Sequence, residues 1–194
     1  MDCHLARALD WWHQVITLGV CEERAWREVH SDIAHLFCDA SGSPAHLGCV
    51  LAIDGVWLWT HLAMPAHLME CFQHRRDNRI MGLELLAISL GLCSFRAVLG
   101  GRRVVINCDN KGAEVSIVSL HIWNCFCPHL LACQAAVRRG SARSWDHAQL
   151  VHEQWLMAAK LGMHIYIKCV ASRDNIADLP SRRDFVLLEK RKMA

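Results

Sequence analysis

The sequence predicts an α/β fold in which helices lie on both faces of a single mixed β-sheet. Short apolar segments with strand periodicity alternate with segments of helical periodicity, in the order β-β-β-α-β-(α)-α-β-α, which is typical of a mixed sheet covered by helices. The chain has 194 residues, enough for one domain with a sizeable core. Its 53% apolar and 21% charged residues exclude a disordered chain or a collagen-like repeat.

The first half of the chain is expected to hold one helix and three strands. Apolar residues recur at helical spacing over residues 5–29, although Gly19 favours a break, and the Trp11–Trp12 pair is expected to anchor this helix on a neighbour. Strands are predicted at 35–41, 47–53 and 56–62. The dipeptide Asp54-Gly55 between the last two is a favoured hairpin turn.

Two further helices and two further strands are expected after residue 62. A helix capped by Asp77 or Asn78 runs to about Phe95, and a fourth strand covers 102–110. A later helix begins near Ser144 and ends before Gly162. A fifth strand covers 164–170, and a short helical turn follows Asn175.

Cysteine usage and charge limit the class of protein. The eleven cysteines show no CxxC pair or regular spacing, which favours free thiols in an intracellular compartment, cytoplasmic or nuclear. The formal net charge of +2 neither demands nor excludes a nucleic-acid partner. Residues 115–137 carry no charge and are long enough to span a bilayer, but polar residues such as Asn124 and Gln134 interrupt them, so no membrane association is expected.

Acidic residues stand at the ends of two apolar strands. Alternation places Phe37 and Asp39 on one face of the first strand, and Asn107 and Asp109 on one face of the fourth. The carboxyl ends of the strands are where ligands bind in open α/β sheets. We therefore treat Asp39 and Asp109 as candidate site residues.

Two further acids complete the candidate site. Glu84 projects from the helix face expected to be buried, where an unpaired carboxylate is costly, and Asp178 follows the fifth strand. Any one of these acids could be a cap, a turn former or a salt-bridge partner. Four converging carboxylates would repel one another without a cation, and a ligand set made only of oxygen suits Mg²⁺ or Mn²⁺. Two such ions about 4 Å apart are a known device for phosphodiester hydrolysis.

The sequence around these acids resembles the ribonuclease H domain of a retroelement reverse transcriptase. The matching segments are FCDASGS around Asp39, GLELLAISLGL around Glu84, INCDN around Asp109 and SRDNIADLPSR around Asp178. The last segment is similar to the end of this domain in Ty3-like and especially DIRS-like elements. The sequences of the later segments are similar to those of elements in fungal genomes.

The resemblance implies a ribonuclease H-like fold with a five-stranded mixed sheet of order 3-2-1-4-5. It also implies cleavage of the RNA strand of RNA–DNA hybrids, with Asp39, Glu84, Asp109 and Asp178 as both catalytic and metal-binding residues for two Mg²⁺ or Mn²⁺ ions. The implied partners are the hybrid and the polymerase domain of a parent reverse transcriptase. The domain would cover 32–183, preceded by a helical extension at 1–31 from a linker and followed by a tail at 184–194.

The sequence departs from this family in two places. The loop before the last acid reads CVASRD and lacks the His or Gly that some relatives carry there. No Tyr-x-Asp-Asp motif is present, so the chain is not a complete reverse transcriptase. The alternative is therefore an inactive or domesticated remnant that acts as a nucleic-acid-binding or protein-interaction module, with Trp11, Trp12 and the insert described next as an interface.

Residues 115–134 interrupt the family pattern, and three interpretations stay open. The segment could be an added helical element, or a translated retained intron, because Val115-Ser116 and Cys133-Gln134 can be encoded by splice-like codons. It could also be a metal site, although C-x-C is poor zinc spacing; the residues of that site would be His121, Cys125, Cys127 and His129.

Arginines flank the four acids in the sequence, and they are candidate contacts to phosphate groups on an otherwise nearly neutral chain. Ordinary solvated surface is the competing interpretation for each of them. The candidate nucleic-acid-binding residues are Arg138, Arg139, Arg143 and Arg182.

Overall fold

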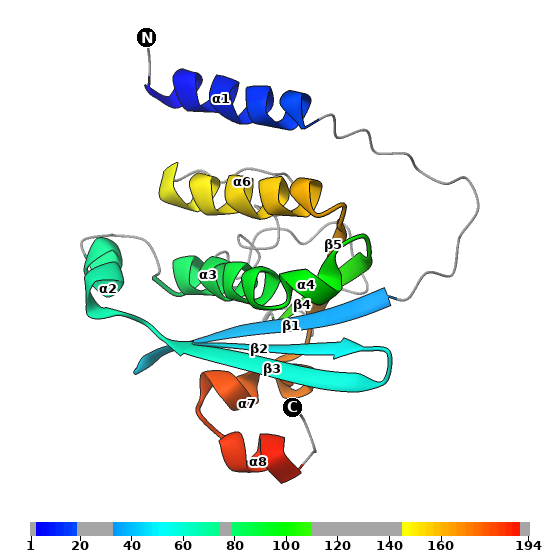
Figure 1. The fold of residues 1–194 in the computed structure, drawn as a ribbon. Helices are drawn as coiled ribbons and strands as arrows, with labels where there is room; N and C mark the ends of the chain where they lie inside the picture. Colours follow the sequence, from blue (N-terminus) through cyan, green and yellow to red (C-terminus); the bar gives the residue numbers. More distant parts are fainter. Residues whose placement is uncertain (1–2, 19–32, 74–78, 110–144, 191–194) are drawn as a thin grey trace, which may run out of the picture.

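The computed structural model describes residues 3–18, 33–73, 79–109 and 145–190. A five-stranded sheet separates two unequal groups of helices (Figure 1). Helices α3, α6 and α1 are stacked in that order on one side of the sheet, and the short helices α7 and α8 lie on the other. The predicted α/β architecture with a mixed sheet is confirmed.

The strands follow the order β3-β2-β1-β4-β5 across the sheet. Their bounds are β1 Ile33–Gly42, β2 Ala45–Ile53, β3 Val56–Ala63, β4 Arg103–Asp109 and β5 His164–Val170. The first three form an antiparallel meander, whereas β4 pairs parallel to β1 and β5 pairs parallel to β4. All five strands lie where the sequence pattern predicts them, and the strand order agrees with the order that the resemblance implies.

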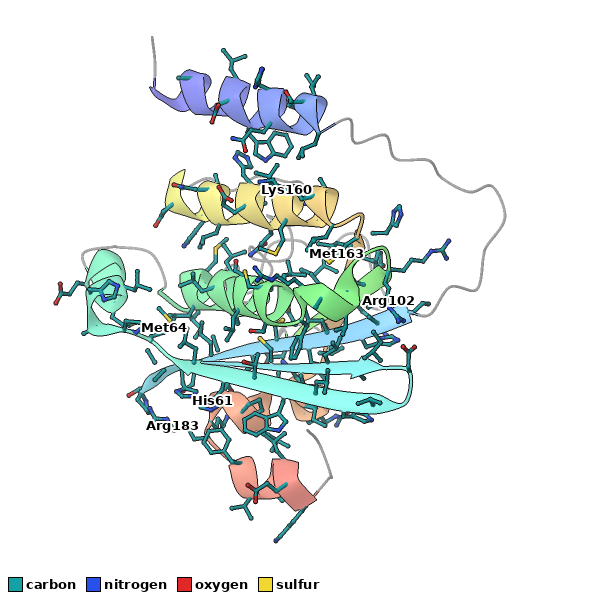
Figure 2. All side chains as sticks on the ribbon, viewed as in Figure 1. His61, Met64, Arg102, Lys160, Met163 and Arg183 are labelled. Carbon is teal, nitrogen blue, oxygen red and sulfur yellow. The ribbon has the colours of Figure 1, made fainter. Side chains whose placement is uncertain are left out.

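The hairpin between β2 and β3 forms at the expected dipeptide. Asp54 and Gly55 have φ angles of 51° and 77°, so both lie in the left-handed region that a tight two-residue hairpin requires. Arg102, which precedes β4, forms an ion pair of 3.0 Å with Asp54. This contact ties the hairpin to the amino-terminal end of the parallel strands, far from the labelled Arg183 in Figure 2.

Helix α3 (Arg79–Ser94) packs on β1 and β2, and α6 (Trp145–Lys160) packs on α3. Gln154 of α6 donates hydrogen bonds of 2.8 Å to the Leu85 carbonyl and 3.0 Å to the Ser89 hydroxyl, which joins the two helices through a buried amide. The core lies between these helices and the sheet. Its fully buried side chains include Leu36, Leu51, Leu85, Ile88, Leu92 and Ile106.

Helix α1 (Cys3–Thr17) ends before Gly19, and residues 19–32, which include the rest of the predicted first helix, lie outside the described residues. Trp11 anchors α1 on α6 by donating a hydrogen bond of 3.2 Å to the His152 carbonyl. Trp12 was expected to share this role, but its side chain is 57% exposed. Trp12 points away because adjacent residues on a helix face different directions.

The sequence pattern did not predict three helices. Helix α2 (Ala66–Gln73) follows β3, the single turn α4 (Arg96–Leu99) follows α3, and α8 (Phe185–Lys190) lies in the segment expected to be a tail. Helix α7 (Asp178–Ser181) is also a single turn, as is the 3₁₀ turn η2 (Ser172–Asp174). In the described part of the chain, no helix is both long enough and apolar enough to cross a membrane.

Candidate active site

Two of the predicted site residues lie side by side at the carboxyl edge of the sheet. In the parallel pairing of β1 with β4, Cys38 is opposite Cys108, so Asp39 and Asp109 follow as the next residues on the two strands. The faces of both strands that point to α3 are apolar up to this point, with Leu36 and Cys38 on β1 and Val104, Ile106 and Cys108 on β4. The register therefore brings together two acids that are 70 residues apart in the chain.

Helix α3 contributes the third acid. Glu84 is only 8% exposed, and its neighbours on the buried side of the helix, Leu83 and Ala87, are 1% and 0% exposed. The helix packs over β1 and β2, so Glu84 faces the sheet rather than solvent. The prediction that this carboxylate comes from a buried helix face is confirmed.

Helix α7 contributes the fourth acid, on the opposite face of the sheet from α3. Asp178 is the first residue of α7, and its Oδ1 atom accepts a hydrogen bond of 2.6 Å from Nε of Arg182, one turn later. Asp178 is also close enough to Asp39 for its negative charge to raise the Asp39 pKa. The fourth acid thus approaches Asp39 while paired with an arginine.

Asp39 is affected by two of the other acids. Burial, with the charges of Asp109 and Asp178, raises the pKa of Asp39 to about 6, against the lowering effects of Ser181 and Arg182. Asp39 is 8% exposed. A buried carboxylate among other carboxylates is destabilised in its charged form, because desolvation and like charges act in the same direction.

Glu84 is affected more strongly. Burial raises the pKa of Glu84 to about 8, and the charges of Asp109 and Asp39 contribute to the same rise. Among the described residues, no lysine or arginine forms an ion pair with Glu84. At neutral pH this side chain is therefore largely protonated in the metal-free protein.

Two serines that the sequence analysis did not select hold the acids in place. The Ser181 hydroxyl, at the end of α7, donates a hydrogen bond to Asp39, and the Ser172 hydroxyl, in the loop after β5, donates one to Asp109. Both serines belong to the SRDNIADLPSR segment. The sequence shows how far these two serines are from Asp178, but only the fold shows that they contact Asp39 and Asp109.

The loop after β5 is fixed to the sheet by an asparagine. Nδ2 of Asn175 donates a hydrogen bond of 3.0 Å to the carbonyl of Cys38, and its Oδ1 accepts one of 3.3 Å from the backbone nitrogen of Ala177. Asn175 is 3% exposed. The amide therefore joins the residue before Asp39 to the start of α7, and it explains why an asparagine stands in this turn.

A glycine on β2 allows α7 to lie directly on the sheet. Gly48 is the register partner of Asp39, and a Cβ atom built on it would lie 2.3 Å from the Ser181 nitrogen and 2.8 Å from the Ala177 carbonyl oxygen. No side chain fits in this space. The close backbone approach places both Ser181 and Asp178 beside Asp39.

A histidine pair lies next to this contact. Nε2 of His46 and Nδ1 of His61 are 3.0 Å apart, and Arg183 donates a hydrogen bond of 3.4 Å to Nδ1 of His46. Because a guanidinium only donates, Nε2 of His46 carries the proton and donates to His61. Burial, with the nearby Arg183 and His61, lowers the pKa of His46, which favours its neutral form. Figure 2 shows His61 and Arg183 on the same side of the sheet as α7.

The donor set suits a hard divalent cation, but the side chains are not arranged as a finished metal site. Within residues 3–18, 33–73, 79–109 and 145–190, no group of three or more His, Cys, Asp or Glu side chains could hold one metal ion as it stands. Serine hydroxyls and Arg182 bind oxygens of Asp39, Asp109 and Asp178 instead. Burial, and to a smaller extent the neighbouring acids, raises the pKa values of Asp39 and Glu84, and a bound cation would favour the ionised forms of both.

Several predictions concern residues outside the described part of the chain. These are Arg138, Arg139, Arg143, the helix caps at Asp77, Asn78 and Ser144, and the whole segment 115–134. Arg182 is described: its side chain is 62% exposed, although Nε binds Asp178. It therefore lies at the acid edge with part of its guanidinium open to solvent.

Comparison with known proteins does not assign this chain to a family. No family model matches the sequence, and no curated protein matches it.

Proposed function

We propose that the chain is a ribonuclease H-like, metal-dependent endonuclease that cleaves the RNA strand of RNA–DNA hybrids. The observation that carries the proposal is the convergence of Asp39, Glu84, Asp109 and Asp178, which come from two strands and from helices on opposite faces of the sheet. The strand order β3-β2-β1-β4-β5 and the four matching sequence segments support the family assignment. We further propose that the chain derives from a retroelement polyprotein and acts beside a polymerase domain inside the cell.

The four acids would hold two Mg²⁺ or Mn²⁺ ions. Such ions supply an activated water and stabilise the leaving oxygen in phosphodiester hydrolysis. The chain itself contributes positioning: the parallel register of β1 and β4 fixes Asp39 and Asp109, while Ser181 and Ser172 fix the rotamers of these two carboxylates. Residues held this way on strands keep a site within the small tolerances that catalysis requires.

A cleavage assay tests the proposal directly. The full chain with Mg²⁺ is incubated with an end-labelled RNA–DNA hybrid, and the expected result is endonucleolytic cutting of the RNA strand only. Asp109→Asn should abolish cleavage. The matched control is Asp174→Asn. Asp174 lies in the turn after β5 that also contains Ser172, the residue that binds Asp109, but the Asp174 side chain is 66% exposed and pairs only loosely with Arg173, at 4.0 Å.

A metal-binding measurement separates loss of ions from loss of folding. Titration calorimetry with Mg²⁺ should give heat for the native chain and for Asp174→Asn, and none for Asp109→Asn. A folded native chain that neither binds Mg²⁺ nor cuts the hybrid contradicts the nuclease proposal. That result would favour the second candidate function, a binding module without activity. The supporting observation is that Ser172, Ser181 and Arg182 already bind oxygens of the carboxylates.

A further inference from the structure

Among the described residues, α7 and α8 cover only part of the sheet face opposite α3. The strand register places alternate residues of neighbouring strands on this face: His35 is opposite Val105, and Val105 is opposite Tyr166. Tyr166 is 62% exposed. We call the uncovered part the open face, and it consists of Ile33, His35, Phe37, Trp57, Arg103, Val105, His164, Tyr166 and Lys168.

Aromatic rings are distributed across the open face. Trp57 on β3 is 37% exposed and stacks on Phe37 of β1, with ring centroids 6.4 Å apart and an interplanar angle of 23°. Tyr166 lies on β5, two strands beyond β1 on the other side. Exposed rings of this size on a sheet are unusual unless something flat covers them.

The charged groups on the open face all have the same sign. Arg103 and Lys168 are cations, and His35 and His164 become cations when protonated. The residues that make up the open face include no aspartate or glutamate. Asp39 and Asp109 follow on the same faces of β1 and β4, at the carboxyl edge of the sheet. The charge complement of such a surface is a polyanion.

A surface that combines exposed rings with cations matches one class of ligand. Single-stranded nucleic acid offers a planar base for each ring and a phosphate for each cation, whereas in a duplex the base faces are stacked on one another and hidden. A protein partner would need aromatic and acidic side chains in matching positions, whereas each nucleotide of a single strand supplies both a base and a phosphate. The geometry therefore favours a single strand over a duplex and over a protein partner.

We propose that the open face binds single-stranded nucleic acid, with bases stacked on Trp57 and Tyr166 and phosphates bound by Arg103 and Lys168. The strand would end at the acid edge, because Lys168 pairs with Asn107, two residues before Asp109, in the β4–β5 register. This binding requires no cleavage and no metal, so it goes beyond the proposed nuclease function. It would hold a strand outside the hybrid while the acids act on the duplex.

Binding is measured on the full chain in EDTA, by fluorescence anisotropy with labelled oligo(dT) of about 16 nucleotides. Tyr166→Ala is expected to weaken binding about tenfold, the effect of losing one stacked base. Lys168→Ala is expected to lower the slope of log K against log salt by about one. Circular dichroism confirms that each variant remains folded.

Matched controls come from the helical side of the molecule. Trp12→Ala removes an aromatic side chain that is 57% exposed on α1, and Lys160→Ala removes an exposed lysine at the end of α6. Both should bind the oligonucleotide like the native chain. Equal affinity of the native chain, Tyr166→Ala and Lys168→Ala would overturn the proposal, as would self-association that Tyr166→Ala abolishes, since a second copy would then occupy the face.

The outcome is independent of the nuclease test. Asp109→Asn should keep oligonucleotide binding while losing cleavage and Mg²⁺ binding. Failure of the hybrid assay with intact, Tyr166-dependent oligonucleotide binding would reject the nuclease and retain the open face. Cleavage of the hybrid without Tyr166-dependent oligonucleotide binding would reject the open-face proposal alone.

Discussion

The backbone nitrogen of Ser181 lies where the side chain of any residue larger than glycine at position 48 would begin: a Cβ on Gly48 would be 2.3 Å from it. Because Gly48 is also the register partner of Asp39, the contact decides how close α7 comes to the acids.

Gly48→Ala is therefore expected to push α7 off the sheet. We expect a loss of about 1–3 kcal/mol in the free energy of unfolding, the usual range for a group inserted where there is no space, together with loss of hybrid cleavage. Urea unfolding and the cleavage assay measure the two effects. Gly42→Ala is the control, because its Cβ would meet only Cδ1 of Ile80 at an ordinary 3.8 Å. A Gly48→Ala protein as stable as Gly42→Ala would contradict the packing described for α7.

Ser181→Ala removes the hydroxyl that stabilises the ionised form of Asp39. The pKa of Asp39 should then rise above its value of about 6. Burial and the neighbouring acids still raise this pKa, but the Ser181 hydrogen bond no longer lowers it. NMR titration of the metal-free chain, with carboxyl carbons labelled, measures the change. Ser89→Ala, which removes a hydroxyl bonded to the Leu85 carbonyl within α3, should leave the titration of Asp39 where it is.

Glu84→Gln tests the cost of the buried carboxyl group. The folded-state pKa of about 8 lies above the ordinary value of 4.5, so the native state holds a proton that the unfolded chain releases between these values. The stability from Glu84 is therefore complete below about pH 4.5 and is lost as the pH rises through about 8.

The glutamine variant should lack this decline, so its advantage over the native chain should grow from pH 5 to pH 9. Thermal unfolding in EDTA across this range is the measurement. Addition of Mg²⁺ should raise the native melting temperature most at high pH, where Glu84 is ionised. Parallel stability curves for the two proteins would show that Glu84 does not titrate as the structure requires.

Trp11→Ala tests whether α1 is attached through one side chain. Its indole donates to the His152 carbonyl and packs 5.2 Å from the His152 ring, so its removal should release α1 from α6. Faster amide exchange in α1, with unchanged exchange in α3 and the sheet, is the expected signature. Trp12→Ala, whose side chain is exposed, should leave exchange in α1 close to the native rate.

The sequence was sufficient to predict the five strands because each strand has its own local pattern of apolar residues. Five strands, the Asp54-Gly55 hairpin and the buried face that carries Glu84 follow from periodicity and turn chemistry. The strand order required the resemblance, since local patterns say nothing about which strands become neighbours.

The missing parts are those that depend on contacts between distant residues. The bonds from Ser181 to Asp39 and from Asn175 to the Cys38 carbonyl join positions more than 130 residues apart, which no local pattern encodes. Helix α8 is too short to show a period, and it is held by Phe185, which stacks on Trp59 with centroids 5.4 Å apart. The role of Gly48 is likewise visible only once α7 lies across β2.

The parallel register of β1 and β4 has a consequence for how this chain can change over time. Because side chains alternate between the faces of a strand, deleting one residue from either strand would swing its terminal acid to the reverse side of the sheet. Point substitutions can tune the pair Asp39 and Asp109, but changes in length within these two segments cannot be tolerated one residue at a time. Variation in length must instead be confined to the connecting segments between them.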